Sequence, residues 1–142
     1  MEVDRDAFFW MMEDGKIPPP KAAETLGVKF LKIEPDQGSI EMSFEGKEEF
    51  LNPVGNIQGG FLAAMLDDTM GPALAATLGK GEFTPTISLN VQFLAPAKVG
   101  KIYGYGEIVK KGKQICYLKG KLVQNDRVVA TATASAIIQK VK

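Results

Sequence analysis

One run of the sequence, residues 61–78, is apolar or small on nearly every side of a helix. Its core positions recur at intervals of three and four residues, at Leu62, Met65, Leu66, Met70, Ala73, Leu74 and Leu78. A helix with almost no polar face must be covered all round, so this one is expected to lie deep in the protein. Pro72 predicts a bend, because it removes the amide of one helical hydrogen bond, and Gly79 and Gly81 are expected to end the helix.

Most of the remaining sequence predicts antiparallel strands. Apolar residues alternate through residues 27–34, 39–45, 83–94, 101–110, 114–124 and 127–139, with turn-forming residues between these segments. The 142 residues are enough for one domain with an ordinary hydrophobic core. An antiparallel sheet with one long helix against it is an α+β architecture.

The first twenty residues have a different pattern from the rest of the chain. Asp4 to Asp14 predicts a short helix, capped by Asp4 or Asp6 and ended by Gly15. This helix is hydrophobic nearly all round, so its own domain or a neighbouring subunit must cover it. Three successive prolines make residues 17–20 an extended linker. Residues 1–20 are therefore expected to be an N-terminal helix and linker, and residues 21–142 the main domain.

Composition excludes several classes of chemistry. The chain has no histidine and one cysteine, which rules out Ser-His-Asp and Cys-His catalysis, imidazole zinc sites and an internal disulfide. Cys116 lies in a strand pattern and is expected to be a buried, inert thiol. The 17 basic and 17 acidic side chains balance, which gives no electrostatic footprint for nucleic acid or an anionic membrane.

No targeting or membrane-spanning segment is predicted. The residues from Met1 to Asp6 are acidic, unlike a secretory signal, and no apolar run reaches the ~18 residues needed to span a bilayer. A cytoplasmic protein without a metal or cofactor is the expectation. Any catalysis must then rest on a carboxylate, lysine, tyrosine or backbone dipole.

The candidate site begins where a loop meets the long helix. Asn52–Asn56 is rich in turn formers, and Gly59 and Gly60 follow at the helix start. The first amides of a helix have no intrahelical partner and lie at its positive end, so they can polarise a carbonyl or stabilise an oxyanion. Glycine also leaves room for another molecule to approach the backbone. The alternative is that the two glycines only allow a tight turn.

Two carboxylates lie in the middle of the apolar helix, at Asp67 and Asp68. A buried, unpaired carboxylate is costly, and such groups collect at functional sites, although a structural cap or salt bridge is the alternative. Asp67 follows Gly59 by eight residues, which is about 12 Å along a helix. A site that combines the two therefore needs a second copy of the helix, which predicts a homodimer with two composite sites.

These residues resemble a known family signature. Asn52 to Gly60, followed by Asp67, resembles the signature of the hotdog-fold acyl-CoA thioesterases, especially their PaaI-like branch. Ser88–Ala97 is similar to the family's third strand and its end, and Lys111–Lys113 to the following hairpin. The resemblance extends over roughly residues 27–140. It implies an α+β hotdog fold, with the antiparallel sheet wrapped around one long central helix.

The resemblance also implies roles for single residues. The implied catalytic set is Asp67 as general base or nucleophile, Gly59 as the amide that polarises the thioester carbonyl, Asn52 as an orienting amide and Thr86 as a hydroxyl facing the carboxylate. The implied substrate-binding set is Gln58, Gly60, Asp68, Lys111, Gly112 and Lys113. Gln58 stands where the family usually has histidine. Asp68 matches a position that is usually not catalytic, and the roles of the two aspartates exchange if Asp67 is the one that turns outward or pairs with a lysine.

Thioester hydrolysis is coherent without histidine, because the thiolate leaving group needs little acid assistance. One base or nucleophile and one oxyanion donor suffice, and we predict that Asp67 is ionised at neutral pH. The expected function is hydrolysis of a small or medium acyl-CoA by a homodimer or a dimer of dimers. Two alternatives stay open: a non-hydrolytic acyl-CoA-binding protein, which Gln58 favours, and a structural module in which the aspartates serve dimer contacts. Whether the carrier is coenzyme A or acyl carrier protein is also open.

Overall fold

The computed structural model describes residues 2–141, so Met1 and Lys142, at the ends of the two expected units, lie outside the described residues. In chain order the helices and strands are α1 (Phe8–Glu13), α2 (Lys21–Leu26), β1 (Lys29–Glu34), β2 (Ser39–Gly46), α3 (Gly59–Ala75), β3 (Glu82–Phe83), β4 (Thr86–Phe93), β5 (Gly100–Lys111), β6 (Ile115–Gln124), β7 (Arg127–Ile137) and β8 (Gln139–Lys140). Single 3-10 turns occupy Pro35–Gln37 and Glu48–Phe50. No helix in this described range is both long and apolar enough to cross a membrane.

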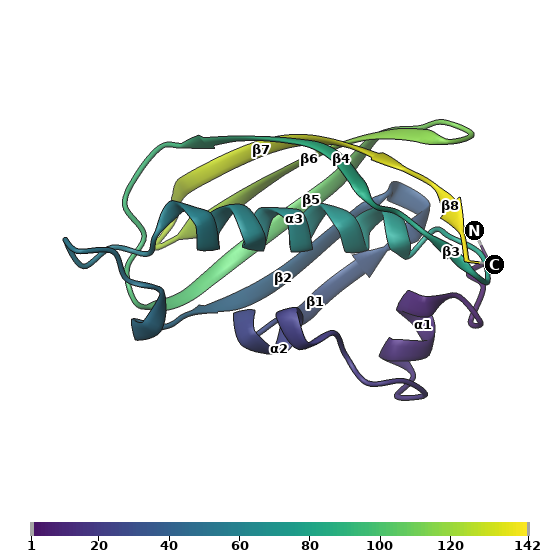
Figure 1. The fold of residues 1–142 in the computed structure, drawn as a ribbon, viewed down its shortest axis with the longest axis horizontal. Helices are drawn as coiled ribbons and strands as arrows, with labels where there is room; N and C mark the ends of the chain where they lie inside the picture. Colours follow the sequence, from purple (N-terminus) through teal and green to yellow (C-terminus); the bar gives the residue numbers. More distant parts are fainter. Residues whose placement is uncertain (1, 142) are drawn as a thin grey trace.

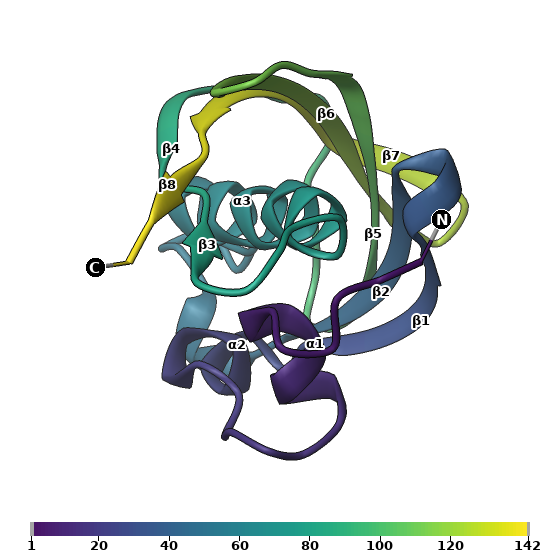
Figure 2. The ribbon, with the colours of Figure 1, turned by 90° about the vertical axis from the view of Figure 1, so that its right-hand side faces the viewer.

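The main sheet wraps around α3. Its six strands are antiparallel and run in the order β1-β2-β5-β6-β7-β4, while β3 and β8 pair separately. Figure 1 shows α3 lying along the sheet, and the end-on view in Figure 2 shows the sheet arching over it. The predicted α+β architecture, one antiparallel sheet wrapped around one long helix, is confirmed.

The core lies between α3 and the inner face of the arch. Met65, Leu66 and Leu74 of α3 are completely buried there, as are Phe44 and Ile102 of the sheet. This packing explains why the helix carries so few polar residues, since burying each large apolar side chain contributes about 1.5–3 kcal/mol.

Two glycines of β5 set how closely α3 can approach the sheet. A Cβ at Gly104 would lie 2.5 Å from the Thr69 hydroxyl, and a Cβ at Gly106 would lie 2.5 Å from the Thr69 carbonyl oxygen. Both distances are far inside van der Waals contact. At Gly106 the neighbour is backbone, which cannot move aside as the end of a side chain can.

We expect Gly106→Ala to lower the free energy of unfolding by about 1–3 kcal/mol, because the added methyl overpacks the contact with Thr69. Gly60→Ala is the matched control: Gly60 is also an ordinary-φ glycine, and nothing lies within 4 Å of a Cβ there. The control should change stability by no more than about 1 kcal/mol, in the stabilising direction. Denaturant unfolding of both variants measures the difference, and equal stabilities would contradict the close-approach argument.

The structure corrects the predicted bounds of the long helix. It begins at Gly59, so both glycines form its first turn, and it ends at Ala75 rather than at Leu78. Gly79 and Gly81 therefore do not end it. Pro72 lies in its last turn, where the missing amide removes one hydrogen bond close to an end that carries unpaired groups anyway.

Two further differences involve proline. The segment predicted as one strand, residues 83–94, is split into β3 and β4 at Thr84 and Pro85, because Pro85 has no amide to donate to a ladder. The helix α2 was not predicted at all. It begins directly after Pro20, which fixes the entry into its first turn, and ends at Gly27 in the left-handed conformation.

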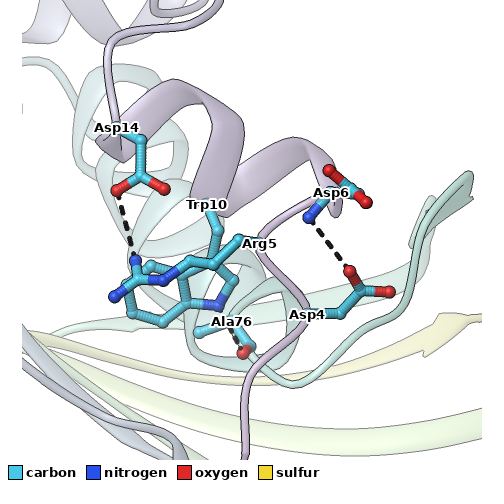
Figure 3. Close-up of polar contacts among 6 residues, drawn as sticks. All are labelled: Asp4, Arg5, Asp6, Trp10, Asp14 and Ala76. Carbon is cyan, nitrogen blue, oxygen red and sulfur yellow. Dashed lines mark hydrogen bonds and ion pairs between the residues drawn. The ribbon is translucent and has the colours of Figure 1, made fainter.

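The first helix is shorter than predicted, and neither aspartate caps it. Its N-cap is Ala7, which makes no side-chain capping bond. The carboxylate of Asp4 instead accepts hydrogen bonds from the amides of Asp6 (2.9 Å) and Lys80 (2.9 Å), the first of which is drawn in Figure 3. These bonds lower the pKa of Asp4, with the Asp6 amide contributing most. Gly15, just beyond the helix, has positive φ as the prediction requires.

Trp10 attaches α1 to the far end of α3. Its indole Nε1 donates to the carbonyl oxygen of Ala76 at 2.9 Å, just past the last residue of α3 (Figure 3). The guanidinium of Arg5 lies 4.5 Å from the Trp10 ring and also pairs with Asp14. Phe9 and Trp10 are buried by this chain itself, whereas Phe8 is 41% exposed.

Candidate active site

The loop before α3 is shaped by Asn52. Its Oδ1 accepts hydrogen bonds from the amides of Val54 and Asn56, each at 3.1 Å. The same turn is closed by backbone bonds between Asn52 and residues 55–56. In this chain Asn52 therefore holds the loop that leads to α3, and its side-chain oxygen is occupied by that task.

The N-terminus of α3 presents free backbone donors. The amides of Phe61 and Leu62 both donate to the carbonyl of Gln58, whereas the amides of Gly59 and Gly60 have no recorded acceptor within residues 2–141. Gln58 is the N-cap, its side chain is exposed, and it makes no capping bond. Gly60 is exposed with open space around it. A ligand carbonyl can reach these amides without displacing a side chain of the helix.

Phe93 packs over the first glycine. A Cβ at Gly59 would lie 3.0 Å from the ring of Phe93, the last residue of β4, so a side chain at this position would push the ring aside. Glycine at position 59 therefore lets the Phe93 ring lie close over the helix start, a contact that goes beyond a simple turn.

Asp67 is paired with a hydroxyl from the sheet. Thr86, the first residue of β4, donates from Oγ1 to Oδ1 of Asp67 at 2.8 Å. Thr86 is exposed and Asp67 is half-buried, so the pair lies at the surface of the chain. The hydrogen bond fixes one oxygen of the carboxylate and leaves Oδ2 to meet a substrate or water.

Asp68 has a different environment from its neighbour. Its Oδ2 is shielded from solvent and has no hydrogen-bond partner among the described residues. Burial, and secondarily the negative charge of Asp67, raise the pKa of Asp68 from 3.8 to about 6. No ion pair to either aspartate is recorded in the described range. Neither carboxylate therefore has the lysine partner that the alternative of a structural salt bridge requires.

Asp68→Asn is expected to stabilise the protein at neutral pH. Because the pKa of Asp68 is higher in the folded state than in the unfolded state, the free energy of unfolding falls as pH rises from about 4 through about 6. The loss is about 3 kcal/mol once Asp68 is fully ionised. Asparagine has the same shape and does not ionise, so the variant should gain about 1–3 kcal/mol at pH 7.5 and little at pH 4. Denaturant unfolding at both pH values measures this, and a gain of the same size at both would contradict ionisation as the cause.

The free amides and the Asp67–Thr86 pair lie at different levels of α3. Gly59 is its first residue and Asp67 its ninth, so about 12 Å of helix separates them. One chain therefore does not bring these two parts of the expected site together.

The turn at Lys111–Lys113, which was expected to bind substrate, makes contacts within the fold. Nζ of Lys111 donates to the carbonyl oxygen of Thr77 at 3.0 Å, close to the end of α3, and a Cβ at Gly112 would collide with the carbonyl oxygen of Ile115. Lys113 is exposed. Cys116 is fully buried, as predicted, and burial raises the pKa of its thiol.

A cleft that the sequence did not predict runs beside Asp67. It has a volume of about 1040 Å³ and lies between α3 and the N-terminal segment of α1, the proline linker and α2. Asp67, Asp68 and Thr86 all line it, together with Gly71 of α3. The one sequence signal for its far wall is the helix-forming run Lys21–Leu26, which ends at a glycine. Among residues 2–141 there is no group of three potential metal ligands.

The chain is similar to known thioesterases. The family model described as the thioesterase superfamily matches residues 54–131, more than half of the chain. Acyl-coenzyme A thioesterase 13 of Mus musculus is 28% identical over 109 residues, which cover 70% of this chain and 76% of that protein. The human protein of the same name is 26% identical over 99 residues, covering 63% and 70%.

Solved structures give the same result. A phenylacetic acid degradation-related protein from Ralstonia eutropha JMP134 superposes with a TM-score of 0.90 and 39% identity, covering 92% of this chain and 98% of that one. The PaaI protein from the phenylacetic acid degradation operon of E. coli superposes with a TM-score of 0.81 over 99% and 97% of the two chains. Its 17% identity supports the fold alone.

Proposed function

The chain belongs to the thioesterase superfamily and is a thioester hydrolase, and from this premise we propose that Asp67 hydrolyses a small or medium acyl-CoA with the help of a helix N-terminus. The observation that carries the proposal is the Asp67–Thr86 hydrogen bond of 2.8 Å beside a largely apolar cleft. It supports the proposal because one oxygen of the carboxylate is held at the edge of a cleft that is wide enough for an acyl group. The free amides of Gly59 and Gly60 supply the second requirement, a donor for an oxyanion.

The proposed reaction uses Asp67 as the proton acceptor or as the nucleophile. In the first route Asp67 takes a proton from water, the water oxygen bonds to the thioester carbon, and the carbonyl electrons move onto oxygen, where the amide of Gly59 stabilises them. Collapse of this intermediate breaks the carbon–sulfur bond and releases the thiolate. In the second route a carboxylate oxygen of Asp67 bonds to the thioester carbon, the carbon–sulfur bond breaks and the thiolate leaves. Water then hydrolyses the mixed anhydride, which releases the free acid and restores the Asp67 carboxylate. Both routes use Thr86 to orient Asp67.

The remaining residues of the expected site have smaller proposed tasks. Gln58, whose side chain is exposed beside the free amides, supplies an amide near the thioester in place of the family histidine. Asn52 acts through the loop that it holds. Lys113 provides positive charge for the phosphates of coenzyme A, and Gly112 allows the tight turn that carries it. Lys111 adds its charge from a position fixed by its hydrogen bond to Thr77.

We further propose that the active form is a homodimer, or a dimer of dimers, with composite sites. The 12 Å between Gly59 and Asp67 requires amides from a second copy. The edge strand β4 is where that copy fits: in the described part of the chain it pairs with β7 alone, and its Ile87 and Phe93 are 58% and 55% exposed. An unpaired edge with exposed apolar side chains is a surface that a second strand and helix can cover.

Turnover of a panel of acyl-CoAs tests the function. Free thiol should be released from saturated acyl-CoAs of short and medium length, and the same panel on acyl carrier protein identifies the carrier. Tight binding of acyl-CoA without thiol release would instead support the non-hydrolytic alternative that Gln58 favours. If the protein neither binds acyl-CoA nor releases thiol from it, the structural alternative remains.

A further inference from the structure

The cleft beside Asp67 has walls from two separate parts of the chain. One wall is a single face of α3, which presents small residues on either side of the aspartates: Ala64, Gly71 and Ala75. The other wall is the N-terminal arm, by which we mean α1, the proline linker and α2 (residues 8–26). Figure 2 shows α1 and α2 together on the side of α3 that the sheet does not cover.

The small residues of α3 leave an open space beside the helix, and the arm forms the opposite side of that space. No atom of the described residues outside its own helix lies within 4 Å of a Cβ at Gly71, so the space over this residue is open. From Asp67 to Ala75 the α3 wall extends about 12 Å, which is the extended length of a chain of about eight to ten carbons. The arm faces this space with Phe8, Met12 and residues 17–19, all of which are apolar.

The charges of the cleft have one sign. Among residues 2–141, four acidic side chains line it, Glu13, Glu24, Asp67 and Asp68, and no lysine or arginine does. A carboxylate at the end of an acyl chain would lose water there without gaining a counter-ion and would face these acidic groups. An uncharged hydrocarbon or aryl group has no charge to desolvate and can pack against the apolar residues of the wall.

We propose that the N-terminal arm forms the acyl subsite of the enzyme, and that this subsite accepts uncharged apolar acyl groups of up to about ten carbons and rejects acyl groups that end in a carboxylate. This inference rests on the proposed function, since it takes the thioester carbonyl to lie at Asp67. The acyl chain then extends along α3 towards Ala75, with Phe8 and Ala22 among the arm residues that limit its length and width.

Two variants of opposite effect test the arm. Phe8 is 41% exposed and Ala22 is exposed, so changing either costs the fold little. Phe8→Ala should raise kcat/KM for dodecanoyl-CoA relative to hexanoyl-CoA by about tenfold, and Ala22→Phe should lower that ratio by a similar factor. Phe83→Ala is the matched control, because Phe83 is 38% exposed and lies outside the cleft. An unchanged ratio in both arm variants would overturn the inference.

The predicted rejection of acyl groups that end in a carboxylate is tested by comparing two thioesters of equal chain length. Wild-type enzyme should prefer octanoyl-CoA over the octanedioic acid mono-CoA thioester by about 100-fold in kcat/KM, and Glu24→Lys should reduce that preference by about tenfold or more. Equal rates for the two thioesters would overturn the proposed chemistry of the subsite. Binding of the non-hydrolysable thioethers of the same acyl groups is measured alongside. Selective binding without turnover would support the subsite while contradicting the proposed function, and turnover without selectivity would do the reverse.

Discussion

Replacing Asp67 with asparagine is expected to lower kcat for acyl-CoA hydrolysis by about 100- to 10,000-fold, the usual contribution of a positioned base. Asparagine keeps an oxygen that can accept the hydrogen bond from Thr86, so the geometry of the site should persist. What the substitution removes is the ability to take a proton or to attack the thioester. KM should change little, because the side chain is the same size and the acyl cleft is unaltered.

The control for this variant is an aspartate outside the site. Asp126 lies in the turn between β6 and β7 with positive φ, a conformation that asparagine also adopts, so Asp126→Asn should keep full activity. If instead Asp68→Asn abolishes turnover while Asp67→Asn retains it, the two aspartates exchange roles.

The periodic elements of this fold could be predicted because their signals are local. Alternating residues specify a strand, and the spacing of Leu62, Met65 and Leu66 specifies a helix wherever it packs. The ends of elements were predicted less well. α3 ends at Ala75, and the carbonyl oxygen of Ala76 just beyond it accepts a hydrogen bond from Trp10, a contact between distant segments that a local pattern does not contain. The six-residue helix α2 has too few residues for a periodic signal and depends on packing against β2, with Leu26 buried in the main core.

The two halves of the candidate site differ in the same way. The Gly59–Gly60 helix start and the neighbouring aspartates are visible in the sequence, because each is unusual where it stands. The different environments of Asp67 and Asp68 are not, since adjacent helical positions point about 100° apart and only the placement of β4 and the arm decides which is paired and which is buried. The cleft beside Asp67 is the extreme case, because the N-terminal arm that forms one wall ends at Leu26 and the α3 wall begins only at Ala64.

Two inactive variants should restore each other if the site is shared between chains. Asp67→Asn lacks the base, and Gly59→Val places a branched side chain against the Phe93 ring and over the free amides, so each homodimer should be nearly inactive. A mixed dimer contains one pairing of an intact Asp67 with an intact Gly59 of the other chain. Its activity should be about half that of the wild type, because one of the two symmetric sites is complete.

The mixed dimer is obtained by co-expressing the two variants with different affinity tags and purifying on both. A site built within one chain predicts no recovery, since each chain then carries its own defect. Two differently tagged copies of Asp67→Asn, purified in the same way, control for contaminating activity. A mixed dimer that is folded and elutes as a dimer but stays inactive would contradict the composite site, and an active Gly59→Val homodimer would remove Gly59 from the oxyanion role. Recovery by mixing would place the base and the oxyanion donor on different chains, as the 12 Å of helix between Gly59 and Asp67 demands.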